Sequence, residues 1–217
     1  MPSKSLITVS LVFFLITIFG PFQVIAQDLE RELDHNPTIL VFGDSISSAY
    51  GMTNDQGWVS LLNQKLRENN NNHRVINASV SGETTTGGLT RLPKILKAYK
   101  PGIVILELGG NDGLRGYPVA QIQRNIQRMI ELCKDSDSEV LLVGMVLPYN
   151  YGYRYRNAFE NVFLELATNN EVQFLPFLLD GASTSFDLIQ DDRLHPRPEA
   201  QELILHQIWE HLEGLLK

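Results

Sequence analysis

The sequence has one cysteine among its 217 residues, so no disulfide can form within the chain. That cysteine, Cys133, lies on the apolar side of a predicted helix, which favours a buried core thiol. The chain also lacks internal repeats, linkers and low-complexity tracts, apart from a run of asparagines at 69–72. Its length suits one domain with a sizeable core, since two packed domains would be cramped.

Positive charge is scarce. Lysine and arginine number 18 against 25 aspartates and glutamates, which gives a formal net charge of -7. This balance offers no electrostatic reason to expect nucleic-acid binding or docking on anionic lipid. The sequence has no glycine-rich phosphate loop, and most of its histidines lack metal-ligand spacing with Cys, Asp or Glu. We therefore expect no nucleic-acid partner, no metal and no cofactor.

Long apolar runs are rare outside the N-terminus. The first five residues carry one lysine, Leu6–Phe19 is almost wholly apolar, and compact side chains occupy the -3 and -1 positions before Gln27. This three-part layout is typical of a secretory signal peptide over residues 1–26. Cleavage would leave a single domain over residues 27–217, periplasmic or secreted, which we expect to be a monomer.

An uncleaved membrane anchor is the alternative for this segment, because Leu6–Ala26 is nearly long enough to span a bilayer. We favour cleavage, since Gly20 and Pro21 interrupt the run. No cysteine follows the run, which excludes a lipoprotein anchor. We therefore expect no stable membrane anchor on the mature chain.

Beyond a short polar leader, apolar runs alternate with amphipathic stretches. The apolar runs predict strands at Thr38–Phe42, Arg74–Val80, Ile103–Leu108, Glu139–Leu147 and Val172–Leu178. The amphipathic stretches predict helices at Trp58–Glu68, Thr84–Tyr99, Pro118–Lys134, Arg154–Asn169 and Pro198–Leu216. Alternation of this kind predicts an α/β fold with a parallel sheet between two layers of helices.

Four polar blocks follow predicted strands or precede the last helix: Gly43-Asp44-Ser45, Gly82, Gly109-Gly110-Asn111-Asp112 and Asp192-Arg193-Leu194-His195. Ligand sites in such sheets lie beyond the carboxyl ends of the strands. Each block alone has a simpler interpretation. The serine suits a helix N-cap, the glycine and asparagine blocks suit turns, and the last block suits a surface pair.

Nucleophilic catalysis explains why these residue types occur together. A serine hydroxyl is a poor nucleophile unless a base removes its proton, and histidine suits that task at neutral pH. Asp192 precedes His195 by three residues, so one helical turn or a tight loop places both on one face. Asp192 can then accept the Nδ1 hydrogen of His195 and present Nε2 to Ser45.

In this chain order the four blocks resemble the signature of the SGNH, or GDSL-type, hydrolases. Residues 77–84, 107–116 and 147–152 are similar to the branch of that family that holds bacterial multifunctional thioesterases, arylesterases and lysophospholipases. The resemblance extends from about Thr38 to the C-terminus. Two departures are Ile46, where the family name has leucine, and the tyrosine-rich segment Tyr149–Tyr155.

The resemblance implies a flavodoxin-like three-layer α/β/α sandwich around a five-stranded parallel sheet. It also implies a serine esterase or thioesterase with the triad Ser45, Asp192 and His195. The oxyanion donors would be the backbone N–H groups of Ser45 and Gly82 and the side-chain amide of Asn111. The implied substrates are small acyl esters and thioesters: aryl or short-chain esters, fatty acyl thioesters and lysophospholipids.

The segment after the fourth predicted strand should form the wall of an acyl groove, through Leu147, Pro148, Tyr149 and Asn150. The alternative is a tyrosine-rich surface loop. Glu107, in an otherwise apolar strand, is expected to have a local partner such as Arg115 rather than a catalytic role.

Two other functions stay open. One is a carbohydrate or peptidoglycan O-acetyl esterase, which is an activity found in the same family. The other is a non-catalytic surface-binding module, which would not require the serine, histidine, aspartate and asparagine set.

Overall fold

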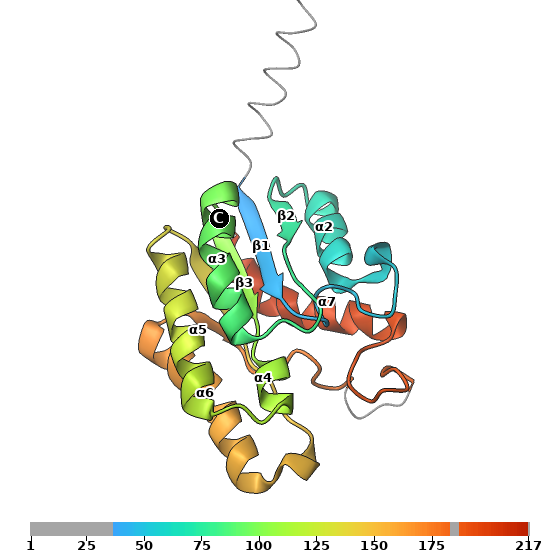
Figure 1. Ribbon diagram of the computed structural model, residues 1–217. Coiled ribbons are helices and arrows are strands. Elements are labelled where there is room, and N and C mark those ends of the chain that lie inside the picture. The colour runs from blue at the N-terminus through green and yellow to red at the C-terminus, as the bar shows by residue number, and fades with distance from the viewer. Residues whose placement is uncertain (1–36, 183–186, 217) are drawn as a thin grey trace, which may run out of the picture. The chain divides into compact units, whose positions relative to one another are not determined.

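Five short strands pair in parallel in the computed structural model, which describes residues 37–182 and 187–216 (Figure 1). The strands are β1 Thr38–Gly43, β2 Arg74–Asn77, β3 Ile103–Glu107, β4 Glu139–Val143 and β5 Gln173–Leu175. They lie in the order β2-β1-β3-β4-β5, with β1 at the point where the order reverses. The predicted fold class is therefore confirmed. The predicted signal peptide, residues 1–26, lies outside the described residues.

Helices cover both faces of this sheet. The α-helices are α2 Trp58–Glu68, α3 Thr85–Tyr99, α4 Gly110–Leu114, α5 Val119–Lys134, α6 Tyr153–Asn170 and α7 Gln201–Leu212. Short 3-10 turns occur at Asn54–Gln56, Tyr149–Tyr151, Pro198–Ala200 and Glu213–Leu215. Helices α3, α5 and α6 pack on one face and α2 and α7 on the other (Figure 1). No helix in the described part of the chain is long and apolar enough to cross a bilayer.

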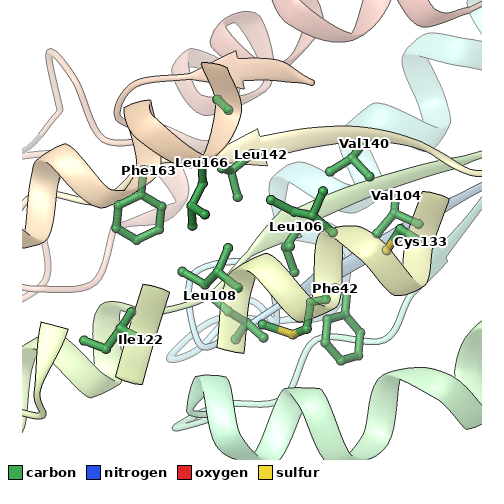
Figure 2. Close-up of a cluster of buried hydrophobic side chains, with 14 of the residues drawn as sticks. Phe42, Val104, Leu106, Leu108, Ile122, Cys133, Val140, Leu142, Phe163 and Leu166 are labelled. Carbon is green, nitrogen blue, oxygen red and sulfur yellow. The ribbon is translucent and has the colours of Figure 1, made fainter. Parts of the chain in front are cut away.

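Two hydrophobic cores follow from the alternation of side chains along the strands. In β1, Leu40 and Phe42 face the core under α3, α5 and α6, whereas Ile39 and Val41 face the core under α2 and α7. Figure 2 shows the first core, where Cys133 of α5 packs among apolar side chains. Cys133 is fully buried, as predicted, and burial raises the pKa of its thiol to about 12.

The element bounds differ from the predictions at the carboxyl edge of the sheet. Strands β2, β4 and β5 end earlier than predicted, because their last residues leave the ladder to form loops around the site. One such loop stays close to β1, since the Val80 N–H donates to the Gly43 carbonyl at 3.0 Å. The short helix α4 was not predicted, and the predicted closing helix Pro198–Leu216 is divided into a 3-10 turn, α7 and a second 3-10 turn.

Candidate active site

The loop after β1 presents Ser45 at the carboxyl edge of the sheet. Ser45 begins a turn, not a helix, so the N-cap interpretation does not hold. The Asp44 carbonyl accepts the Ser48 N–H at 3.0 Å, which closes the turn. Gly43 is needed for close approach, because a Cβ at this position would collide with the Glu107 carboxyl. The Ser45 residue is 8% exposed, so the loop leaves a small opening to solvent.

The structure brings the three predicted triad residues together. His195 Nε2 lies 2.8 Å from Ser45 Oγ, and His195 Nδ1 lies 2.6 Å from Asp192 Oδ2. Because the Asp192 carboxylate accepts the Nδ1 hydrogen, Nε2 is left to accept the serine proton. The Tyr50 ring also lies against the imidazole, with centroids 4.4 Å apart. This arrangement can activate a serine hydroxyl for attack on an acyl carbon.

A tight loop, not a helical turn, holds Asp192 beside His195. The second carboxylate oxygen, Oδ1, accepts the backbone N–H groups of Leu194 and His195 at 2.9 and 3.0 Å. Burial alone would raise the pKa of Asp192, but hydrogen bonds from the His195 backbone and ring outweigh it and lower the pKa. The carboxyl is therefore ionised at neutral pH, as the acceptor of an imidazole hydrogen has to be.

The other two predicted oxyanion donors, Gly82 and Asn111, follow β2 and β3. Gly82 has a backbone φ of +77°, which favours glycine, and its carbonyl accepts from Arg115 at 3.4 Å. Asn111 belongs to α4 at the end of β3, and its amide donates to Asp44 Oδ2 at 3.0 Å. This bond fixes the amide with a second N–H available, because an amide nitrogen carries two hydrogens.

The expected partner of Glu107 was wrong. Arg115 does not contact it. The Glu107 carboxyl instead accepts the Ser47 hydroxyl at 2.6 Å and the Asp44 N–H at 3.2 Å, directly beneath the serine loop. Burial and the neighbouring charge of Asp44 hold the pKa of Glu107 well above its usual range, and burial also raises the pKa of Asp44, to about 6. Through these two bonds the Glu107 carboxyl ties the serine loop to β3.

A cavity of about 440 Å³ opens beside Ser45 and His195. Its wall includes Leu147, Pro148 and Tyr149, as expected for a groove, whereas Asn150 is exposed and lies outside it. Sequence reasoning missed further members of the wall, which come from separate loops and from α4 and α6 and share no local pattern. They are Ile46, Leu114, Met145, Val146, Arg156, Phe177, Leu179, Ile189, Arg193 and Leu194.

The cavity can hold an apolar chain next to the nucleophile, since most of these side chains are aliphatic or aromatic. Within residues 37–182 and 187–216 no group of three histidine, cysteine or acidic side chains is placed to bind a metal ion.

Comparison with known proteins matches residues 41–203 to the GDSL-like Lipase/Acylhydrolase family. The chain is 45% identical to "Esterase TesA" of Pseudomonas aeruginosa over 82% of its own length and 89% of that protein. It is 36% identical to "Thioesterase 1/protease 1/lysophospholipase L1" of Escherichia coli K12, covering 94% and 92% of the two chains. A solved structure, "Crystal Structure of TesA", superposes with a TM-score of 0.81 at 45% identity, over 82% of this chain and 99% of the other.

Proposed function

Because the chain belongs to the GDSL-like Lipase/Acylhydrolase family and is an ester hydrolase, we propose that it acts through Ser45, His195 and Asp192. The single observation that carries this assignment is the continuous hydrogen-bonded path from Ser45 Oγ through the imidazole to Asp192, with separations of 2.8 and 2.6 Å. Ser45 and His195, at the start of this path, line an apolar cavity. A binding module would need the cavity but not the path.

The reaction runs in two halves. His195 Nε2 takes the Ser45 proton as Oγ bonds to the acyl carbon, and the carbonyl electrons move to oxygen. The backbone N–H groups of Ser45 and Gly82 and the free amide hydrogen of Asn111 stabilise this oxyanion. The intermediate collapses, His195 gives its proton to the leaving oxygen or sulfur, and an acyl-enzyme remains. Water then repeats the sequence and releases the acid.

The substrates fall into the class of aryl esters, fatty acyl thioesters and lysophospholipids. The apolar wall supports an acyl chain longer than acetyl, because a two-carbon group would leave most of a 440 Å³ cavity empty. The similar Escherichia coli protein carries thioesterase and lysophospholipase in its name. The acyl chain of such a substrate would lie against Leu147 and Tyr149, which line the cavity.

Export forms part of the proposal. A signal peptide over residues 1–26 would be cleaved and leave a monomeric domain, residues 27–217, in the periplasm or outside the cell. The mature chain would carry no membrane anchor.

Covalent labelling tests the mechanism. A fluorophosphonate probe phosphonylates an activated serine and nothing else in this site. The wild-type protein should become labelled at Ser45, and His195→Ala should label far more slowly although its serine is intact. A Ser48→Ala variant removes a different serine hydroxyl from the same turn, so it should become labelled as the wild type does. Lack of an adduct on Ser45 would remove the proposed mechanism.

A further inference from the structure

Arg193 occupies a backbone conformation that disfavours its residue type. It lies between Asp192 and His195 with φ of +62°, in the left-handed region that glycine adopts readily and other residues rarely. Among the other non-glycine residues with positive φ, Lys100 and Glu171 end α3 and α6, Asn70 and Asp137 follow α2 and α5, and Ala49 lies in the turn after β1. Arg193 follows no helix. A strained residue in a catalytic loop points to a role for its side chain.

The side chain of Arg193 lines the cavity and has no hydrogen-bond or ion-pair partner among the described residues. The other arginine of the cavity wall, Arg156, is already engaged. It donates to the Leu147 carbonyl at 2.7 Å, pairs with Glu160 at 3.2 Å and stacks on the Tyr149 ring. Arg193 therefore brings to the cavity a solvent-exposed guanidinium that forms no ion pair among the described residues, next to the ionised Asp192 in the sequence.

Its position in the loop decides which part of the substrate it meets. In the proposed reaction His195 Nε2 gives its proton to the leaving group, so the leaving group passes beside His195. Arg193 precedes His195 by two residues in the same tight loop, whose turn is closed by the bond from the Leu194 N–H to Asp192. The backbone of Arg193 therefore lies beside the residue that protonates the leaving group.

Resting on the proposed function, we infer that Arg193 selects substrates whose leaving group carries a phosphate close to the scissile oxygen. A guanidinium offers a planar pair of N–H donors that matches phosphate oxygens. The whole chain is acidic, with a net charge of -7, and repels such substrates unless a local cation offsets the field. In a lysophospholipid the phosphate is attached to the same glycerol as the scissile oxygen, whereas the phosphates of an acyl-CoA are separated from the scissile sulfur by the long pantetheine arm.

The experiment compares substrates that share one acyl chain and differ in the leaving group, all used below their micelle concentrations. They are lysophosphatidylglycerol, monoacylglycerol and acyl-CoA. Arg193→Gly removes the charge and also relieves the backbone strain, so the variant should fold well. Its kcat/KM for lysophosphatidylglycerol should fall roughly 10-fold to 100-fold, mainly through KM, while monoacylglycerol changes less than about twofold. Arg193→Lys should restore part of the loss.

A matched control removes a similar charge elsewhere. Arg124 is exposed on α5 and does not line the cavity, so Arg124→Gln should leave all three rates unchanged. Equal losses on charged and neutral substrates would overturn the inference, because they would show that Arg193 only shapes the loop of Asp192 and His195. An acyl-CoA loss as large as that for the lysolipid, or no loss at all, would overturn it too. Wild-type turnover of a neutral nitrophenyl ester reports separately on the proposed function.

Discussion

Ser45 and His195 share one proton path, and that predicts how their substitutions combine. Ser45→Ala removes the nucleophile and His195→Ala removes its base, so each alone should abolish most of kcat. The double variant should lose little more, since the second change removes a group that no longer has a partner. Steady-state hydrolysis of a nitrophenyl ester measures all three variants. Losses that multiply would mean that the two residues act independently, despite the 2.8 Å separation.

Asn111 tests the oxyanion assignment. Asn111→Ala should lower kcat by roughly 10²-fold to 10³-fold with a small change in KM, because the donor acts on charge that develops in the transition state. The Asn111 side chain is half-buried, and its amide donates a hydrogen bond to Asp44. The fold should therefore persist without it. Circular dichroism and the melting temperature check that point. An unchanged kcat would leave Asn111 as a residue that only orients Asp44.

The raised pKa of Glu107 predicts how the free energy of unfolding depends on pH. Burial raises its pKa, so the folded state keeps a proton that the unfolded chain releases above the ordinary value of 4.5. The native state then binds more protons, and its free energy of unfolding falls as pH rises from 4.5 toward the raised pKa. The rise in the pKa of Asp44, from 3.8 to about 6, has the same sign.

Glu107→Gln cannot ionise and can still accept from Ser47 and the Asp44 N–H. Urea denaturation between pH 4.5 and 8 should show a flatter profile than the wild type, with catalysis retained. Glu107→Ala orphans both donors and should lose about 1–3 kcal/mol for each. Glu202→Gln, an exposed carboxyl on α7, is the control and should not alter the slope. A wild-type profile that rises over this range would contradict a raised pKa of Glu107.

The residue types of the candidate site could be predicted from the sequence, and the contacts between them only in part. Asp192 and His195 lie three positions apart, so local geometry alone could pair them. Glu107 reaches Ser47 across 60 positions, and no local rule identifies such a partner. Arg115 was the expected partner because opposite charges nearby in sequence suggest pairing, yet the Glu107 carboxyl lies beneath the serine loop, where the Ser47 hydroxyl and the Asp44 N–H are its donors.

At the scale of elements, Asp112 joins α4 to the start of α3. Its carboxylate accepts the Thr85 N–H at 2.8 Å and the Thr85 hydroxyl at 2.6 Å, where the positive end of the helix dipole favours an anion. Asp112→Asn keeps one oxygen for the Thr85 N–H but replaces the oxygen that accepts the Thr85 hydroxyl by an NH2 donor. It should cost about 1–3 kcal/mol of stability and also lower kcat, because Asn111 is the adjacent residue.

Thermal unfolding and the kcat of Asp112→Asn measure both effects, with Asp135→Asn as an exposed control. A loss of stability without a loss of kcat would show that α4 holds Asn111 in place without this link.

Periodicity could predict the long elements well, because their apolar faces pack on the sheet. Helix α2 begins and ends at the predicted residues. Hydrophobic periodicity fails to predict element ends where apolar residues line a cavity instead of packing on the sheet. Met145 and Leu147 continue the apolar run of β4, but they line the site after the strand has ended at Val143. The five-residue helix α4 is too short to show a period, and glycines at both of its ends suggested a turn.

For the whole molecule, topology could be predicted because alternating strands and helices permit few arrangements. The cavity could not, since its wall combines several loops with residues of α4 and α6, which meet only after folding. Arg193 and Phe177 both line it, yet nothing in their local sequence distinguishes them from surface residues. The positions of the four polar blocks after the strands predict that they lie at the carboxyl edge of the sheet. The apolar side chains that surround them depend on tertiary packing, which the sequence pattern does not reveal.

The depth of this cavity sets the acyl preference of the whole enzyme. Each methylene that leaves water for an apolar wall gains about 0.8 kcal/mol, or nearly fourfold. In a series of nitrophenyl esters kcat/KM should therefore climb over several carbons from acetyl and level off where the groove ends. Leu147→Ala should flatten the climb and spare the acetyl ester, which does not reach that wall. Leu147 is 3% exposed, so the acetyl rate and the melting temperature together separate a wider groove from a damaged fold. If the acetyl ester is the best substrate and longer chains are progressively worse, the enzyme is an O-acetyl esterase and the thioesterase assignment is wrong.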